Sequence, residues 1–184
     1  VKMNPISGTF RKSDAKTTEQ LESKFHKFLD DQKEINELFM VTDEELKIMS
    51  RLCEKGGLIA GPFLKEMSQL IHTEYLLVGQ SDKNSHELIK ESMFAPTVTG
   101  SPVKNAFRII KRYETESRGY YGATIALIGR DQHGEETLDA PIVIRALEID
   151  STGHAVGRVG ATLVRSSDPK SEVKETISKI SGML

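Results

Sequence analysis

Hydrophobic residues recur at helical spacing through the first third of the chain. One series predicts a helix over about residues 18–30 and a second series predicts a helix over about residues 31–55. The apolar members of the two series are Leu21, Phe25 and Phe28, then Ile35, Leu38, Phe39, Leu46, Met49 and Leu52. Residues 13–18 are a polar linker before the first helix, and Gly56-Gly57 ends the second.

Shorter elements follow the break at Gly61-Pro62. The predicted order is a helix at 63–71, a strand at 72–79 that is rich in β-formers, a helix at 85–93 and a helix at 102–114. Three strands joined by short loops come next, at 124–128, 141–149 and 154–165. Strands connected in this way predict an antiparallel meander.

A last helix begins near Pro169, which is tolerated at the first helical position. Either Ser167 or Asp168 can cap it. Glu172, Glu175 and Lys179 lie on one face of this helix at 3.6 residues per turn. Two carboxylates beside an ammonium could hold a cation and a substrate carboxylate, and the alternative is a solvated Glu–Lys pair that adds little stability.

The composition narrows the class of protein. The chain has 184 residues, enough for one core, and a formal net charge of −2 with mixed signs. No basic stripe, no G-x-G-x-x-G after a strand and no membrane-length apolar run is present, so we expect neither a nucleic-acid nor a membrane partner. A single cysteine, Cys53, excludes an internal disulfide and suits a reducing, cytoplasmic location.

Several polar residues stand out from these elements. Glu34 and Glu37 lie three residues apart on a helix face bordered by apolar residues, which fits either a structural pair or a cation site. His72 begins a strand and is alone in sequence. Arg145 interrupts an apolar run, and a charge there needs either a carboxylate partner or an anionic ligand. Thr97 belongs to a hydroxyl- and glycine-rich loop before a helix N-terminus, which suits anions.

Six ordered blocks resemble the chorismate-utilising enzymes, the family of anthranilate synthase component I, aminodeoxychorismate synthase, isochorismate synthase and salicylate synthase. They are P-I-S-G-T at 5–9, K-E-I-N-E-L at 33–38, His72, T-V-T-G-S-P at 97–102, R-G-Y-Y at 118–121 with Arg145, and the G-A-T-L-V-R-S-S-D-P…E-x-x-E-T-x-x-K run at 160–179.

The chain departs from the family pattern at a few positions. Leu38 replaces a His, Val103 replaces a Lys, and residues 41–47 replace an Asp-x-x-Arg-Asn-Asp run. With Met3-Asn4 before the first block, these changes resemble the phenazine-pathway branch, the 2-amino-2-deoxyisochorismate synthases.

The resemblance implies a role for each matched residue. Glu37 and Glu175 would bind Mg²⁺, with Glu34 and Glu172 holding its waters. Chorismate would be held by Gly8, Thr9, Thr97, Gly160 and Lys179, and its enolpyruvyl carboxylate by Arg145 and Tyr121. His72 would lie beside the C4 hydroxyl, so His72 and Lys179 are the expected catalytic residues.

The resemblance also implies a fold and an activity. The fold is α+β, an antiparallel sheet covered by helices, and residues 1–184 would be the C-terminal portion of one chorismate-binding domain. Ammonia from a glutamine amidotransferase domain or subunit would add at C2 of chorismate as hydroxyl leaves C4, giving 2-amino-2-deoxyisochorismate or anthranilate. The groups that activate the nucleophile and protonate the leaving group lie upstream of the matched blocks, so we expect the isolated chain to have an incomplete site.

Two other interpretations of the function remain open. One is a sister activity that uses water, as in isochorismate or salicylate synthase. The other is a non-catalytic half-domain that needs another chain to complete its core. A homodimer is one candidate assembly.

Overall fold

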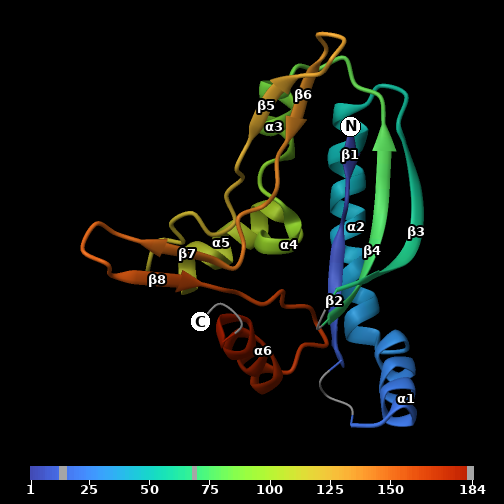
Figure 1. The fold of residues 1–184 in the computed structure, drawn as a ribbon, viewed down its shortest axis with the longest axis vertical. Coiled ribbons are helices and arrows are strands. Elements are labelled where there is room, and N and C mark those ends of the chain that lie inside the picture. The colour runs from blue at the N-terminus through green and yellow to red at the C-terminus, as the bar shows by residue number, and fades with distance from the viewer. Residues whose placement is uncertain (13–15, 68–69, 182–184) are drawn as a thin grey trace. The chain divides into compact units, whose positions relative to one another are not determined.

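The computed structural model describes residues 1–12, 16–67 and 70–181, and it divides into two compact units (Figure 1). The first unit comprises Val1–Ser81 with Val164–Ser166, and the second comprises Asp82–Leu163 with Ser167–Leu184. The linker expected at residues 13–18 lies partly outside the described residues.

The first unit contains an antiparallel sheet arranged around β4 (Leu70–Gly79). β1 (Lys2–Met3) and β2 (Ile6–Arg11) follow one another along β4, and β3 (Gly57–Glu66) also pairs with it. The predicted strand at 72–79 is therefore confirmed.

The predicted helix at 63–71 is wrong for its described residues, which lie in β3 and β4, and residues 68 and 69 lie outside the described part of the chain. Phe63 to Glu66 continue β3, and they pair with Glu74 to Ile71 of β4. A short apolar run cannot be assigned to a helix or a strand by periodicity alone. Here the backbone hydrogen bonds to β4, a partner later in the chain, decide the outcome.

Two helices cover this sheet, as the apolar spacing predicts. α1 (Thr18–Leu29) is capped by the Thr17 side chain and α2 (Gln32–Leu52) by the Asp31 side chain. The α2 residues buried in the unit are Leu38, Val41, Thr42, Glu45, Ile48, Met49 and Leu52. They form the core with β4, whose Leu77 is fully buried.

The second unit combines four helices with two hairpins among its described residues. Its helices are α3 (Ser85–Ser92), α4 (Pro96–Thr99), α5 (Val103–Tyr113) and α6 (Pro169–Ser181). Three of them match predicted helices, and the short α4 falls in a segment read as a loop. No helix in the described part of the chain is long and apolar enough to cross a membrane.

The predicted three-stranded meander is confirmed only in part. An isolated antiparallel bridge joins Thr124 to Ile142, but no continuous three-stranded sheet forms among the described residues. Instead β5 (Leu127–Arg130) pairs with β6 (Glu136–Asp139), and β7 (Ala146–Ile149) pairs with β8 (Ala155–Arg158). Each register is set locally by a tight turn. In one turn Asp131 Oδ1 accepts the backbone N–H groups of His133 and Glu135, and Asp150 Oδ1 accepts those of Thr152 and His154 in the other.

The core of the first unit contains a carboxyl group whose pKa is raised by burial. Glu45 lies on the buried face of α2 and is only 8% exposed. Burial raises its pKa from 4.5 to about 7, because the apolar surroundings disfavour the charged form. The folded chain therefore binds a proton at pH values where the unfolded chain has released it.

This difference predicts a pH-dependent stability. Because the folded pKa is the higher one, stability is greatest below the unfolded pKa and falls as pH rises towards 7, by about 2–3 kcal/mol between pH 5 and pH 8. Glu45→Gln should remove this loss. Urea unfolding at several pH values tests it, with Glu54→Gln, an exposed position, as control. Parallel pH profiles for the parent chain and Glu45→Gln would contradict the account.

Candidate functional site

The first matched block forms a bulge in β2. The pairing of β2 with β4 shifts register between Ser7 and Phe10, and Gly8 has a φ of +72°. A Cβ atom on Gly8 would lie 2.9 Å from Glu34 Oε2 and 3.0 Å from Thr73 Oγ1. Glycine is therefore required twice, for its backbone conformation and for the close approach of α2.

His72 is fixed against this bulge. Its Nδ1 lies 2.7 Å from the Gly8 carbonyl oxygen and 3.3 Å from Thr9 Oγ1, and the residue is 7% exposed. A carbonyl oxygen only accepts hydrogen bonds, so Nδ1 carries the proton and the neutral ring has its free lone pair on Nε2. The structure thus brings Gly8, Thr9 and His72 together, and His72 can exchange a proton through Nε2.

Glu34 and Glu37 share one face of α2, as their spacing predicts. Lys33 Nζ lies 3.1 Å from Glu34 Oε1 and 3.2 Å from Glu37 Oε2, and the three side chains are largely shielded from solvent. Two carboxylates around an ammonium show that this position accommodates positive charge. Their oxygen atoms are also the ligands that Mg²⁺ prefers.

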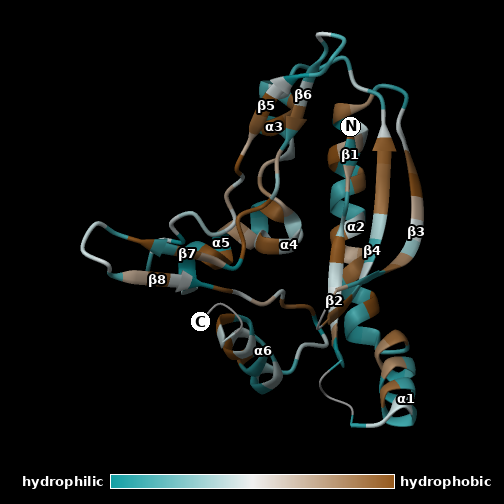
Figure 2. Cartoon of the chain, viewed as in Figure 1, coloured by the Kyte–Doolittle hydropathy of each residue, from teal (hydrophilic) through white to brown (hydrophobic). Residues whose placement is uncertain are grey.

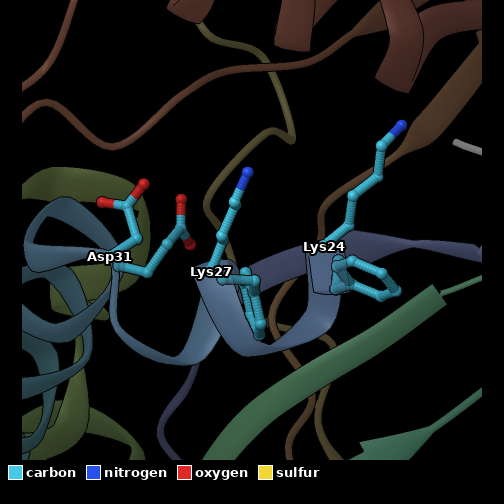
Figure 3. A pocket seen from close by; sticks show the side chains of 6 residues that line it. Lys24, Lys27 and Asp31 are labelled. Atoms are coloured by element: carbon cyan, nitrogen blue, oxygen red, sulfur yellow. The ribbon is translucent and has the colours of Figure 1, made fainter. Parts of the chain in front are cut away.

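A cavity of about 460 Å³ opens beside Glu34 (Figure 3). Its lining residues are Phe10, Lys24, Lys27, Phe28, Asp31 and Glu34. Lys24 and Lys27 extend in a similar direction from α1, while the rings of Phe10, Phe25 and Phe28 pack together and hold α1 on β2. Lys24 and Lys27 are not predicted from the sequence, because their only signal is a three-residue spacing that is common on solvated helices.

The second unit brings together four other predicted residues. A Cβ atom on Gly160 would lie 2.5 Å from Tyr121 Oη, so the ring occupies the space that a side chain would need. Lys179 Nζ donates to the Gly160 carbonyl oxygen at 3.0 Å and pairs with Glu175 Oε1 at 2.6 Å. Tyr121, Gly160, Glu175 and Lys179 therefore form one cluster.

Thr97 is joined to the segment between β8 and α6. Thr162 Oγ1 donates a hydrogen bond to the Thr97 carbonyl oxygen at 2.9 Å. The backbone at Thr97 is thereby held near Ala161 and Gly160, which follow one another along the chain. The Thr162 hydroxyl therefore has a structural use.

Arg145 differs from the expectation of a charge within a strand. It lies in an exposed bend before β7 with a φ of +51°, so the predicted strand at 141–149 begins too early. Burial raises the pKa of Tyr121, and the positive charges of Arg118 and Arg145 act in the opposite direction. Arg145 is thus close enough to the Tyr121 hydroxyl to influence it electrostatically.

The N-terminus of α6 positions the last two glutamates. Asp168 caps the helix, since its Oδ2 accepts hydrogen bonds from the N–H and hydroxyl of Ser171. Glu172, one turn inside, is only 6% exposed, and Glu175 is the residue paired with Lys179. Asp168 rather than Ser167 is therefore the cap.

The four predicted metal ligands are divided between the units, with Glu34 and Glu37 in one and Glu172 and Glu175 in the other. Across residues 1–12, 16–67 and 70–181, no group of three or more His, Cys, Asp or Glu side chains is arranged to hold a metal ion. The shared magnesium site stays a prediction.

The sequence of the chain is similar to those of known proteins. The family model for chorismate binding enzymes matches residues 1–184. The chain belongs to the chorismate binding enzyme family. The phenazine-specific anthranilate synthase of Pseudomonas chlororaphis is 48% identical over 182 residues, which are 99% of this chain and 28% of that protein. Anthranilate synthase component 1 of Synechocystis sp. is 32% identical over 190 residues, which cover 99% of this chain and 36% of that protein.

Solved structures of two proteins share the fold. Anthranilate synthase component I from Streptococcus pneumoniae TIGR4 matches with a TM-score of 0.75 at 24% identity, covering 99% of this chain and 39% of that one. A protein assigned as a 2,3-dihydroxybenzoate-specific isochorismate synthase from Bacillus anthracis matches with a TM-score of 0.74 at 20% identity, covering 100% and 48%. The α+β fold with antiparallel sheets is confirmed, and the chain spans less than half of each relative.

The close approach of α2 to Gly8 can be tested by substitution in this chain. Gly8→Ala should lower the free energy of unfolding by about 1–3 kcal/mol, because the residue has positive φ and the new methyl group meets Glu34 and Thr73. Gly56→Ala is the matched control, since Gly56 has a φ of +73° and no atom within 4 Å of its Cβ position. Urea unfolding measures both. Equal losses would show that backbone strain alone, without the contact to α2, explains the Gly8 effect.

Proposed function

We propose that the protein containing this chain aminates chorismate at C2 with loss of the C4 hydroxyl. The support is the family match over residues 1–184, joined to 48% identity with a protein named as a phenazine-specific anthranilate synthase. The products considered are 2-amino-2-deoxyisochorismate and, if pyruvate is also eliminated, anthranilate. Ammonia would come from a glutamine amidotransferase domain or subunit.

The carboxylates of the substrate have matching groups in both units. In the first unit, the Gly8–Thr9 bulge would face the ring carboxylate, with the Thr9 hydroxyl as a donor. In the second unit, Lys179 Nζ contacts the Gly160 carbonyl oxygen and Glu175, and its ammonium would bind a substrate carboxylate. Arg145 and the Tyr121 hydroxyl would bind the enolpyruvyl carboxylate, for which a guanidinium fork is suited.

The glutamates fit a magnesium ion by their chemistry. Glu37 and Glu175 would bind Mg²⁺ directly, and Glu34 and Glu172 would hold its water molecules, since all four supply hard oxygen ligands. The bound ion would withdraw electron density from the ring carboxylate. In the first unit, Lys33 already places positive charge between Glu34 and Glu37, which agrees with this assignment.

His72 is suited to the departing hydroxyl. A bond forms between ammonia and C2 while the C4–oxygen bond breaks, so a proton must leave nitrogen and the hydroxyl must leave as water. With Nδ1 donating to Gly8, the Nε2 atom is the end of the imidazole that can hold the hydroxyl. The remaining base and acid would lie on parts of the protein beyond residues 1–184.

A half-domain that needs further protein to complete its core is favoured by a separate observation. β3 is exposed along its whole length, and Leu58, Phe63 and Leu64 are 77%, 48% and 52% exposed. Figure 2 shows hydrophobic residues along this strand. Apolar side chains on an edge strand are typical of a surface that another element covers.

One assay tests the activity and this alternative together. The isolated chain and the full-length protein are each incubated with chorismate, Mg²⁺ and ¹⁵N-ammonium at alkaline pH, and the products are identified by mass spectrometry. We expect a ¹⁵N-labelled product from the full-length protein only, and its mass shows whether pyruvate is retained. A hydroxylated product would instead support the water-using activity.

The controls separate folding from catalysis. Circular dichroism establishes that the isolated chain is folded, and omission of Mg²⁺ should abolish turnover by the full-length protein. An aminated product from the isolated chain would contradict the incomplete site. The absence of any chorismate turnover by the full-length protein would contradict the proposed function.

A further inference from the structure

The hairpin of β7 and β8 carries an ion pair. Arg158 Nη1 donates a hydrogen bond to Glu148 Oε1 at 2.8 Å. The register pairs Ala146 with Arg158 and Glu148 with Val156, so the two charged residues are diagonal neighbours on one face of the hairpin. Their side chains are about equally shielded, with 34% of Glu148 and 30% of Arg158 exposed.

This face is the more covered face of the hairpin. Glu148 is half-buried, whereas its neighbours Leu147 and Ile149, on the opposite face of β7, are 42% and 65% exposed. The usual alternation buries the apolar face of such a hairpin and leaves its polar face to solvent. Here the order is reversed, so the ion pair is turned towards other parts of its own unit.

The turn Arg118–Tyr121 lies against the ion pair. The backbone N–H of Tyr120 donates to Glu148 Oε1 at 3.4 Å. A Cβ atom on Gly119 would lie 2.8 Å from Glu148 Oε1 and 3.2 Å from Arg158 Nη1, and Gly119 has a φ of +56°. The turn therefore rests on the two charged groups with its backbone, and glycine permits this approach.

The neighbouring N–H groups of the turn have acceptors close by in the chain. The Gly119 N–H donates to Ser117 Oγ at 3.2 Å, and the Tyr121 N–H donates to the Arg118 carbonyl oxygen at 3.0 Å. The Tyr120 N–H, between them, instead donates to a carboxylate 28 residues later in the chain. Glu148 thus holds the residue directly before Tyr121 from outside the turn.

Glu148 also links the two groups proposed to bind the enolpyruvyl carboxylate. Arg145 lies three residues before Glu148, in the bend that leads into β7, and Tyr121 lies on the turn that Glu148 contacts. The Tyr121 ring has little freedom, because its Oη would be 2.5 Å from a Cβ atom on Gly160. A displacement of the turn would therefore move the hydroxyl away from a carboxylate bound by Arg145.

We propose that Glu148 and Arg158 are positioning residues that hold the Tyr121 hydroxyl for the enolpyruvyl carboxylate of chorismate. This inference rests on the proposed function, in which Tyr121 and Arg145 bind that carboxylate. Arg158 orients the Glu148 carboxylate, and the carboxylate in turn fixes the backbone before Tyr121. Neither charged group contacts the substrate.

The charges of the pair would have a different effect from its position. Chorismate carries two carboxylates, so a positive charge left near the site attracts it and a negative charge repels it. If only charge mattered, Glu148→Leu would tighten binding and Arg158→Met would weaken it. If the pair positions the turn, both changes weaken binding.

Steady-state turnover of chorismate with ammonium tests this in the full-length protein. We expect Glu148→Leu, Arg158→Met and the double variant each to raise the KM for chorismate by about five- to tenfold. The kcat should stay within about twofold, because the enolpyruvyl carboxylate keeps its charge while C2 and C4 react. Glu148→Gln keeps an acceptor oxygen for the Tyr120 N–H, so its KM should stay within about threefold of the parent value.

A double-mutant cycle shows whether the pair acts through Tyr121. Tyr121→Phe should itself raise the KM for chorismate. Adding Glu148→Leu to Tyr121→Phe should raise KM by less than about twofold more, because the hydroxyl that the pair positions is already gone. A full five- to tenfold further increase would show that the pair affects binding by another route, and the proposal would be wrong.

Arg130→Met is the matched control for Arg158→Met. Arg130 lies in the other hairpin of the unit, and its guanidinium donates to the Gly134 carbonyl oxygen at 2.7 Å. The control makes the same change in net charge on a hairpin strand and should leave KM within about twofold. A rise equal to that of Arg158→Met would contradict a specific role for the β7–β8 pair.

The outcomes separate this inference from the function on which it rests. A lower KM in Glu148→Leu, or an unchanged KM in both single variants, would overturn the positioning role and leave the proposed function intact. Circular dichroism establishes folding, and Arg158→Met carries the comparison if Glu148→Leu does not fold. If the parent protein gives no turnover of chorismate, the proposed function is wrong and the positioning role falls with it.

Discussion

At Gly8, strand β2 lies close to both its neighbour β4 and helix α2, and no side chain fits between them. The position that its Cβ would occupy is 2.9 Å from Glu34 Oε2, and its carbonyl oxygen is bonded to His72. This single close approach sets the distance of α2 from β2 and the orientation of the imidazole. The placement of Glu34, Glu37, Thr9 and His72 depends on it.

The second unit contains a similar arrangement around a glycine. Gly160 leaves room for Tyr121, and its carbonyl oxygen positions the Lys179 ammonium. In each unit a glycine carbonyl holds a nitrogen-bearing side chain, and carboxylates lie beside it. Backbone atoms therefore orient the groups proposed to contact chorismate, and at Gly8 the backbone is held by the pairing of β2 with β4.

The sequence predicted the features that depend on local spacing. The periods of α1 and α2, the cap of α6 and the shared face of Glu34 and Glu37 follow from residues within a few turns of one another. Prediction from the sequence failed where a partner distant in the chain determines the secondary structure. The spacing of residues 63–66 suits a helix, but their pairing with β4 makes them a strand, and the later strands form two hairpins because each turn fixes its own register. Lys24, Lys27 and the exposed bend at Arg145 carried no distinguishing signal.

We propose that Glu37 and Glu175 are both ligands of the magnesium ion on which the proposed amination depends. A double-mutant cycle tests this proposal directly. The affinity of the full-length protein for chorismate in the presence of Mg²⁺ is measured by titration calorimetry for the parent, Glu37→Gln, Glu175→Gln and the double variant. If both carboxylates bind the same ion, each single change weakens binding and the two effects are non-additive by about 1 kcal/mol or more. Additive effects, or unchanged affinity in either single variant, would contradict a shared site.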